Sequence, residues 1–193
     1  GYYGFANAGD EAMLTAIIES LRQVEKNVEL TVLSGNPEDT AAKHQVCSVY
    51  RFNPLGIIRA MKDSELIISG GGSLLQDVTS KRSLLYYLSI IGLGKFFGKK
   101  VMLFAQGIGP IRAKWARKLT SLVCNEADLI TVRDSESAAE LIEMGVKPEK
   151  ITVTADSVLS LNPVTKECGQ YLLQEAGVDL TKPVIGISVR PWS

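Results

Sequence analysis

Hydrophobic positions along this chain fall into short continuous runs that alternate with segments of helical periodicity. The runs of strand length are residues 28–35, 47–52, 65–72, 100–110, 128–134 and 150–157. Apolar residues recur at the spacing of a helix face in residues 10–24, 54–62, 80–98, 112–126 and 135–144. Apolar strands that alternate with helices indicate a parallel sheet with both faces covered. The pattern therefore predicts a doubly wound, Rossmann-like α/β fold.

The remaining segments are assigned by residue type. Residues 1–4 look like the end of a strand, residues 5–9 a tight loop, and the polar residues 36–46 a longer loop. The alternation changes near Asn162-Pro163. We therefore expect a Rossmann-like N-terminal domain over residues 1–162. Residues 163–193 are expected to form a connection and the truncated beginning of a second domain, with a helix at 166–176 and a strand at 183–189. Both ends look cut, so we expect a fragment of a longer protein.

The composition excludes several classes of function. The 193 residues carry 21 basic and 21 acidic side chains, and this zero net charge argues against a dedicated nucleic-acid binder. Three widely spaced cysteines without a CxxC motif favour neither a disulfide framework nor a zinc site, and they indicate a reducing cytosol. His44 is the only histidine and falls in the predicted polar loop, so this chain alone cannot build a histidine-based metal cluster.

Four strand ends carry residues suited to chemistry, because ligands of such sheets bind beyond the carboxyl ends of the strands. The candidate residues are Asn7, Gly9, Asp10, Glu11, Gly70, Gly71, Gly72, Ser73, Gln106, Gly107 and Arg133. Neither GxGxxG nor GxxxxGK[ST] is present, so dinucleotide and P-loop chemistry lack their expected motifs.

The candidates divide into an acidic and a cationic side. The glycines let backbone N–H groups approach an anion, and a helical turn at residues 73–76 would add its positive end. Arg133, on the crevice side of a buried strand, needs an anionic partner, which favours a ligand role over a structural one. A helix N-terminus should lower the pKa of Asp10, which suits a base or a hydroxyl-orienting group. Taken singly, each glycine stretch is equally well a tight βα turn, and Asp10 a dipole-complementing surface residue.

The apolar segment 84–100 is too short and interrupted for a membrane span. Burial against the sheet is the favoured interpretation, and a helix that touches the membrane surface is the alternative. Lys114, Arg117 and Lys118 share one face of the next helix, which is either a solvated face or a contact for anionic lipid.

In their order and spacing, four stretches resemble the polysaccharide pyruvyl transferase family, most closely the CsaB-type enzymes of bacterial cell-wall polymer synthesis. They are GYYGFANAGDEAML, LIISGGGSLLQD, FAQGIGP and TVRDSESAAELIEMGV, and together they span most of residues 1–156. The resemblance implies a GT-B-like enzyme of two domains, with the site in the cleft between them.

The implied reaction moves the pyruvyl group of phosphoenolpyruvate onto two hydroxyls of a sugar, forms a pyruvate ketal and releases phosphate, without cofactor or metal. The implied acceptor is a lipid-linked saccharide containing N-acetylmannosamine, whose ketal is recognised by S-layer proteins. A cytoplasmic protein in peripheral contact with the inner membrane face would follow. In this chemistry Asp10 is the candidate base, and Arg133 is the candidate cation for phosphate or carboxylate. The family's proton donor, a histidine of the second domain, lies beyond this chain, so we expect the fragment alone to be inactive.

Two other interpretations stay open. One is a nucleotide-sugar glycosyltransferase of the same architecture, and the other is a non-catalytic ligand-binding or scaffold domain of a wall-assembly complex.

Overall fold

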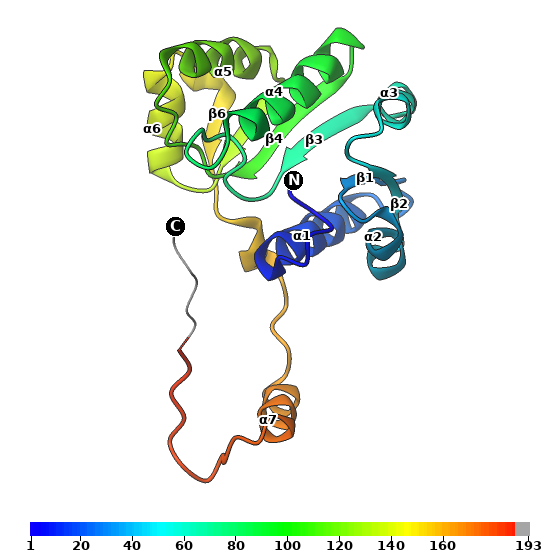
Figure 1. Ribbon diagram of the computed structural model, residues 1–193, viewed down its shortest axis with the longest axis vertical. Coiled ribbons are helices and arrows are strands. Elements are labelled where there is room, and N and C mark those ends of the chain that lie inside the picture. The colour runs from blue at the N-terminus through cyan, green and yellow to red at the C-terminus, as the bar shows by residue number, and fades with distance from the viewer. Residues whose placement is uncertain (188–193) are drawn as a thin grey trace. The chain divides into compact units, whose positions relative to one another are not determined.

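The computed structural model, which describes residues 1–187, is an α/β structure with parallel strands (Figure 1). It divides into two compact units, one over Gly1–Leu161 and one that begins at Asn162. The first unit alternates strands and helices as the hydrophobic pattern predicts, and the predicted fold class is confirmed.

The strands of the first unit form two parallel sheets rather than one. β1 pairs with β2, and the second sheet has the order β3-β4-β5-β6. The strands are β1 (Thr31–Ser34), β2 (Cys47–Tyr50), β3 (Leu66–Gly70), β4 (Lys100–Gln106), β5 (Leu129–Val132) and β6 (Ile151–Val153). The predicted runs extend beyond these bounds into the turns, where the regular pairing of the strands stops.

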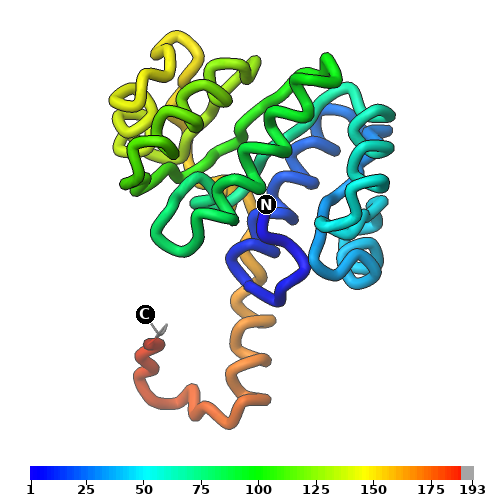
Figure 2. The backbone as a smooth tube through the Cα atoms, turned by 45° about the horizontal axis from the view of Figure 1, so that its top comes forward, coloured from blue at the N-terminus to red at the C-terminus, as the bar shows by residue number. Residues whose placement is uncertain are grey.

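Helices cover both faces of the larger sheet. The helices are α1 (Ala8–Val24), α2 (Pro37–His44), α3 (Pro54–Asp63), α4 (Lys81–Phe96), α5 (Lys114–Glu126), α6 (Ser135–Glu143) and the short η1 (Pro148–Lys150) and η2 (Ser157–Ser160). In Figures 1 and 2, α4 and α5 run side by side over one face, and α1 lies beside η2 on the other. Ile17 of α1 packs against Gly70 of β3, so closely that a Cβ on Gly70 would lie 2.7 Å from Ile17 Cδ1.

The main core lies between the larger sheet and helices α4, α5 and α6. Its large, fully buried side chains include Leu75, Leu84, Ile91, Leu103, Ile130 and Leu141. Burial of each such side chain stabilises the fold by about 1.5–3 kcal/mol. The apolar segment 84–100 is buried against the sheet, as its favoured interpretation predicts, through the buried residues of α4. Among the described residues, no helix is both long and apolar enough to cross a membrane.

One predicted loop is a helix. Residues 36–46 contain α2, which Asn36 caps and Pro37 begins, with Lys43 paired to Asp39 one turn away. Thr40 is its only buried residue. Apolar periodicity could not reveal this helix, because capping and charge pairs specify it instead.

Two shorter predictions near the site are also wrong. Residues 1–4 form no strand, although the Tyr3 carbonyl accepts a hydrogen bond from the Gly35 N–H over 2.9 Å. Residues 73–76 form no helical turn, since Leu75 pairs with Ile108 in an isolated parallel bridge. Bends at residues 77–79 then lead into α4, which begins at Lys81.

The second unit contains α7 (Lys166–Glu175), capped by Thr165, as residues 166–176 predict. None of its residues is buried. The strand predicted over residues 183–189 is absent from residues 183–187, and its last two residues lie outside the described part. A strand requires a pairing partner, and the described residues offer none to this segment.

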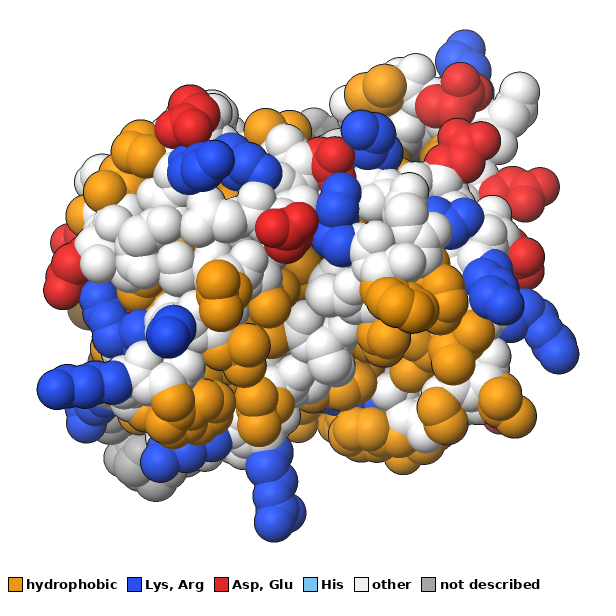
Figure 3. All heavy atoms as spheres, turned by 90° about the horizontal axis from the view of Figure 1, so that it is seen from above, with side chains coloured by type: hydrophobic (Ala, Val, Ile, Leu, Met, Phe, Trp, Pro, Cys, Tyr) orange, Lys and Arg blue, Asp and Glu red, His pale blue; other side chains and the backbone are white. Residues whose placement is uncertain are grey.

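On the face of the molecule seen in Figure 3, basic and acidic side chains are interspersed, and hydrophobic side chains gather in patches between them. This face carries no field of one sign, in keeping with the balanced charge of the sequence.

Candidate functional site

The candidate residues converge at the carboxyl ends of β3, β4 and β5. Asp10 lies half-buried in the first turn of α1, against the glycine loop, which we define as residues 70–73. A Cβ on Gly72 would stand only 3.4 Å from Asp10 Oδ1. A methyl group at residue 72 would therefore lie in van der Waals contact with the carboxylate.

The glycine loop uses conformations that favour glycine. Gly71 and Gly72 have φ values of 83° and 66°. The Gly72 N–H points at the Met13 sulfur over 2.9 Å, and its carbonyl accepts a hydrogen bond from the Gly107 N–H over 3.1 Å. One N–H of the expected anion nest is thus already engaged, and no helix begins here to add its positive end.

Arg133 directly follows β5 and reaches the glycine loop. Its Nη2 donates to Ser73 Oγ over 3.1 Å, so residues 60 positions apart meet at one edge. The anionic partner that this buried-strand arginine needs is present in the chain itself. Nη1 lies 3.2 Å from Asp156 Oδ2, and Nε lies 3.4 Å from Asp134 Oδ2. The need for an anionic partner therefore no longer favours a ligand role for Arg133 over a structural one.

Asp134 also begins the next helix, as its position predicts. Its Oδ1 accepts a hydrogen bond of 2.7 Å from the Ser137 N–H. Hydrogen bonds from Ser137, with a further contribution from Arg133, lower the pKa of the Asp134 carboxyl below its usual value. It is therefore ionised at neutral pH and shares Arg133 with Asp156.

Gly107 leaves room for the arginine. A Cβ at residue 107 would lie 2.7 Å from both Arg133 Nε and Ser73 Oγ. The glycine turn after β4 thus permits the Arg133–Ser73 contact, a role beyond that of a tight βα turn.

Three predicted site residues serve the fold in the geometry observed. Asn7 caps α1 by accepting from the N–H groups of Gly9 and Asp10 over 3.1 and 3.3 Å. Glu11 Oε1 accepts from the Gly4 N–H over 2.8 Å. Gln106 is fully buried and donates to Ser69 O and Oγ over 2.9 and 2.8 Å. These side chains support the edge of the sheet, whereas Asp10, Ser73 and Arg133 line it.

Three residues were missed by the sequence argument. Asp156 follows β6 at the same edge as Arg133, a position that could have flagged it. His44 ends α2, not a polar loop, with Nε2 3.5 Å from Glu11 Oε2. Arg51 follows β2, and its aromatic surroundings are described below. Within the described residues, no group of three or more His, Cys, Asp or Glu side chains could hold a metal ion.

The arrangement places the Asp10 carboxylate and the Arg133 guanidinium on either side of the glycine loop. The model of the polysaccharide pyruvyl transferase family matches residues 7–185. This chain belongs to the polysaccharide pyruvyl transferase family. The matched range contains every candidate residue, and the family is one of transferases.

Two solved structures share the fold of this family member. They are crystal structures of Anabaena Alr3699/HepE, one in complex with UDP-glucose and one with UDP and glucose. Each is 12% identical in sequence, with a TM-score of 0.57, and the match covers 92% of this chain and 48% of that chain. At this identity the likeness shows the fold alone. The chain spans about half the length of these solved structures, and a search of curated proteins finds no match.

Proposed function

We propose that the protein transfers the pyruvyl group of phosphoenolpyruvate to two hydroxyls of a saccharide, forming a cyclic pyruvate ketal and releasing phosphate. The observation that carries the proposal is the placement of Asp10 and the Ser73–Arg133 pair on one edge, across the glycine loop, in a chain of the pyruvyl transferase family.

In this reaction, protonation of C3 of phosphoenolpyruvate creates an oxocarbenium-like centre at C2. One sugar hydroxyl adds to C2, the C2–O bond to phosphate breaks, and the second hydroxyl closes the ketal. Asp10 is the base that accepts a hydroxyl proton. Arg133 stabilises the donor's phosphate or carboxylate, and the substrate anion competes with Asp156 and Asp134 for its N–H groups. The proton donor lies outside this chain, so we propose that the fragment alone is inactive.

The acceptor we propose follows from the CsaB-type resemblance: a lipid-linked saccharide that contains N-acetylmannosamine. Such an acceptor places the enzyme in the cytoplasm, in peripheral contact with the inner membrane face. The reaction needs no cofactor, since phosphoenolpyruvate carries its own leaving group.

A nucleotide-sugar glycosyltransferase is the second candidate. One observation favours it: the structures that share the fold hold UDP-glucose or its parts. A non-catalytic ligand-binding or scaffold domain is the third, and full loss of activity in Asp10→Ala with the fold retained would argue against it.

The deciding experiment measures phosphate release from phosphoenolpyruvate by the full-length protein, with and without a lipid-linked N-acetylmannosamine disaccharide. We expect release that depends on the acceptor. If a panel of acceptors gives no release but UDP release from UDP-glucose depends on an acceptor, the glycosyltransferase is favoured. Asp10→Ala, checked for fold by circular dichroism, should abolish the activity; retained activity would remove the role proposed for Asp10.

A further inference from the structure

Arg51 occupies a second strand end on the same unit. It directly follows β2, and its N–H donates to the Ser34 carbonyl over 2.9 Å at the end of β1. Its own carbonyl accepts the Tyr86 hydroxyl over 3.1 Å. The backbone of Arg51 is therefore fixed from both sides, and only 7% of the residue is exposed.

Aromatic rings surround the guanidinium. The Arg51 Cζ lies between 4.5 and 5.8 Å from the ring centroids of Tyr2, Phe5, Phe52, Tyr86 and Tyr87. Tyr2 and Phe5 stack on each other at 4.1 Å in the loop that leads to Asp10. The rings give cation–π attraction, but they do not neutralise the charge.

Two polar atoms of this cluster lack a hydrogen-bond partner within the described residues. Arg51 forms no ion pair with a carboxylate there, and its polar side-chain neighbours are the hydroxyls of Tyr86 and Tyr87, where Arg51 opposes the rise in pKa that burial causes. Its Nε and the Tyr87 hydroxyl are sealed from solvent without a hydrogen-bond partner. A buried guanidinium with five N–H donors is costly unless an oxyanion accepts from it.

The surroundings favour a singly charged, planar oxyanion. One guanidinium balances one negative charge, and its fork matches a carboxylate held between flat rings. Burial raises the pKa of Tyr87, Arg51 lowers it, and the Asp10 carboxylate raises it, so Asp10 lies within electrostatic reach. A phosphate dianion would leave uncompensated negative charge beside Asp10.

We propose that Arg51 binds a substrate carboxylate among the aromatic rings that surround its guanidinium. The inference rests on the proposed function, in which two substrates could supply the carboxylate. One is the pyruvyl donor, and the other is an acidic acceptor sugar.

The test follows the Arg51 Nε–H signal of the full-length protein by NMR, assigned by its loss in Arg51→Lys. Pyruvate, D-glucuronate and inorganic phosphate are added in turn. We expect a saturable shift with a carboxylate and none with phosphate. A shift with pyruvate assigns the donor, and a shift with glucuronate assigns the acceptor. An equal shift with phosphate, or no shift with either carboxylate, would overturn the proposal.

Kinetics give an independent measurement. If the donor is bound here, Arg51→Lys and Arg51→Met should raise the KM for phosphoenolpyruvate by about 10- to 100-fold. Arg59→Lys, an exposed position on α3, is the matched control. If the unmodified protein releases no phosphate, the proposed function fails while the NMR titration still tests the site. If it is active, and pyruvate moves the signal without an effect of Arg51→Met on KM, donor binding at Arg51 is excluded.

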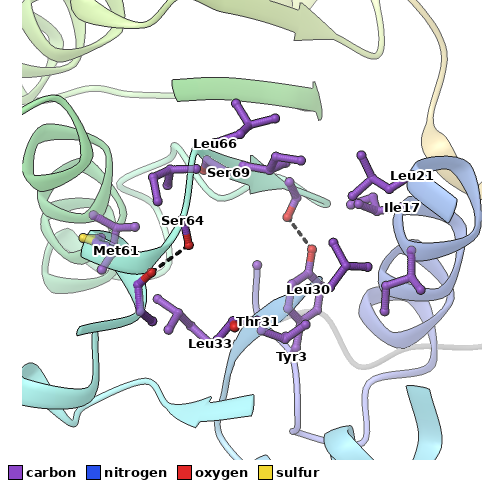
Figure 4. A pocket seen from close by; sticks show the side chains of 18 of the residues that line it. Tyr3, Ile17, Leu21, Leu30, Thr31, Leu33, Met61, Ser64, Leu66 and Ser69 are labelled. Carbon is purple, nitrogen blue, oxygen red and sulfur yellow. Dashed lines mark hydrogen bonds between the residues drawn. The ribbon is translucent and has the colours of Figure 1, made fainter. Parts of the chain in front are cut away.

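A different observation carries a second inference. A cavity of about 700 Å³ separates β1 from β3, the facing edges of the two sheets. Figure 4 shows Leu66 and Ser69 of β3 on one side, and Thr31 and Leu33 of β1 on the other.

Strand alternation directs backbone groups into this cavity. The carbonyls of Leu30 and Ser34 accept hydrogen bonds from the β2 segment, so Thr31, between them, and Leu33 point their N–H and C=O groups away from β2. In the same way Glu65 bonds to Lys100, which leaves Leu66 and Ile68 facing the cavity. Four residues on two edges thus present unpaired ladder groups to one space: Thr31, Leu33, Leu66 and Ile68.

The chain already reaches the carboxyl end of this space. Tyr3 accepts from the Gly35 N–H beyond β1, and its hydroxyl donates to the Gly70 carbonyl of β3 over 2.7 Å. Gly1 lines the cavity. A strand leading into Gly1 would therefore run parallel to both edges.

We also infer that in the full-length protein a strand of about five residues, ending at Gly1, fills this cavity and joins the two sheets into one. Hydrogen exchange tests it on the full-length protein and on a form shortened to begin at Gly1. The amides of Thr31 and Ile68 should exchange at least tenfold more slowly in the full-length form. Those of Val32 and Ile67, which face β2 and β4, are the control and should change less. Equal rates for Thr31 and Ile68 in both forms would overturn the inference.

Discussion

Arg133 and Arg51 both directly follow a parallel strand, yet the fold treats their charges in opposite ways. Arg133 keeps a third of its side chain exposed and lies within 3.4 Å of two carboxylates. Arg51 is 7% exposed and meets five aromatic rings and no carboxylate among the described residues. A strand-end arginine is therefore an anion site only to the extent that the fold leaves its charge unbalanced. By that measure Arg51 is the stronger candidate, although the sequence pattern points to Arg133.

The largest effect is expected at Asp10, which contacts the glycine loop and acts electrostatically on Tyr87 beside Arg51. Asp10→Asn removes the proposed base and should lower kcat by about 10²–10⁴-fold. Acceptor-dependent phosphate release measures it, with Glu19→Gln on the exposed side of α1 as control. An unchanged rate would show that Asp10 is not the catalytic base.

A pair of variants separates ligand binding from structural pairing at Arg133. If Arg133 binds the donor, Arg133→Met should raise the KM for phosphoenolpyruvate by about 10- to 100-fold. Asp156→Asn should not raise it, because it frees the guanidinium from a competing carboxylate. Equal losses in both variants, measured from initial rates, would assign the Arg133–Asp156 pair to the fold.

A smaller effect is expected from Gly107→Ala, whose Cβ would displace Arg133 and Ser73. A shift of a few tenths of an ångström should lower kcat/KM by about tenfold or less. The response of Arg51 Nε–H to pyruvate should be unchanged, since the new methyl group is added beside Arg133. Gly92→Ala, within α4 and without a neighbour inside 4 Å, is the control. It should retain activity and gain up to about 1 kcal/mol of stability.

The smallest effect is expected on the stability of the fold at acidic pH. The folded pKa of Asp134 is depressed, so its stabilising contribution is present above its unfolded pKa of about 4 and is lost as the pH falls through the lower folded value. Asp134→Asn should flatten the stability profile only below about pH 4, followed by urea unfolding at each pH. Arg51→Met should leave that slope unchanged, because no described carboxylate pairs with Arg51. An equal flattening in both variants would contradict the contrast between the two regions.

The helices and strands that face the main core could be predicted because burial imposes periodicity. Leu84 and Ile91 of α4 lie seven residues apart, and Val101 and Leu103 of β4 lie two apart, which are the spacings of one face in a helix and in a strand. The helix α2 could not be found this way, since a single buried residue gives no period. Glycine and arginine at strand ends indicated the edge at which Asp10, Ser73 and Arg133 lie together. The sequence pattern did not show that Arg133 pairs with a carboxylate of this chain, because its partner Asp156 lies 23 residues further on.

The sequence by itself determined the order of strands and helices, the parallel α/β class, and the edge at which Asp10, the glycine loop and Arg133 gather. These follow from local patterns, because period and capping act within a few residues. The tertiary structure alone decided that, among residues 1–187, Arg133 meets two carboxylates and Arg51 meets none. It also decided that the sheet is divided at β1 and β3. Charge balance and strand pairing depend on residues distant along the chain, and only folding brings those residues together.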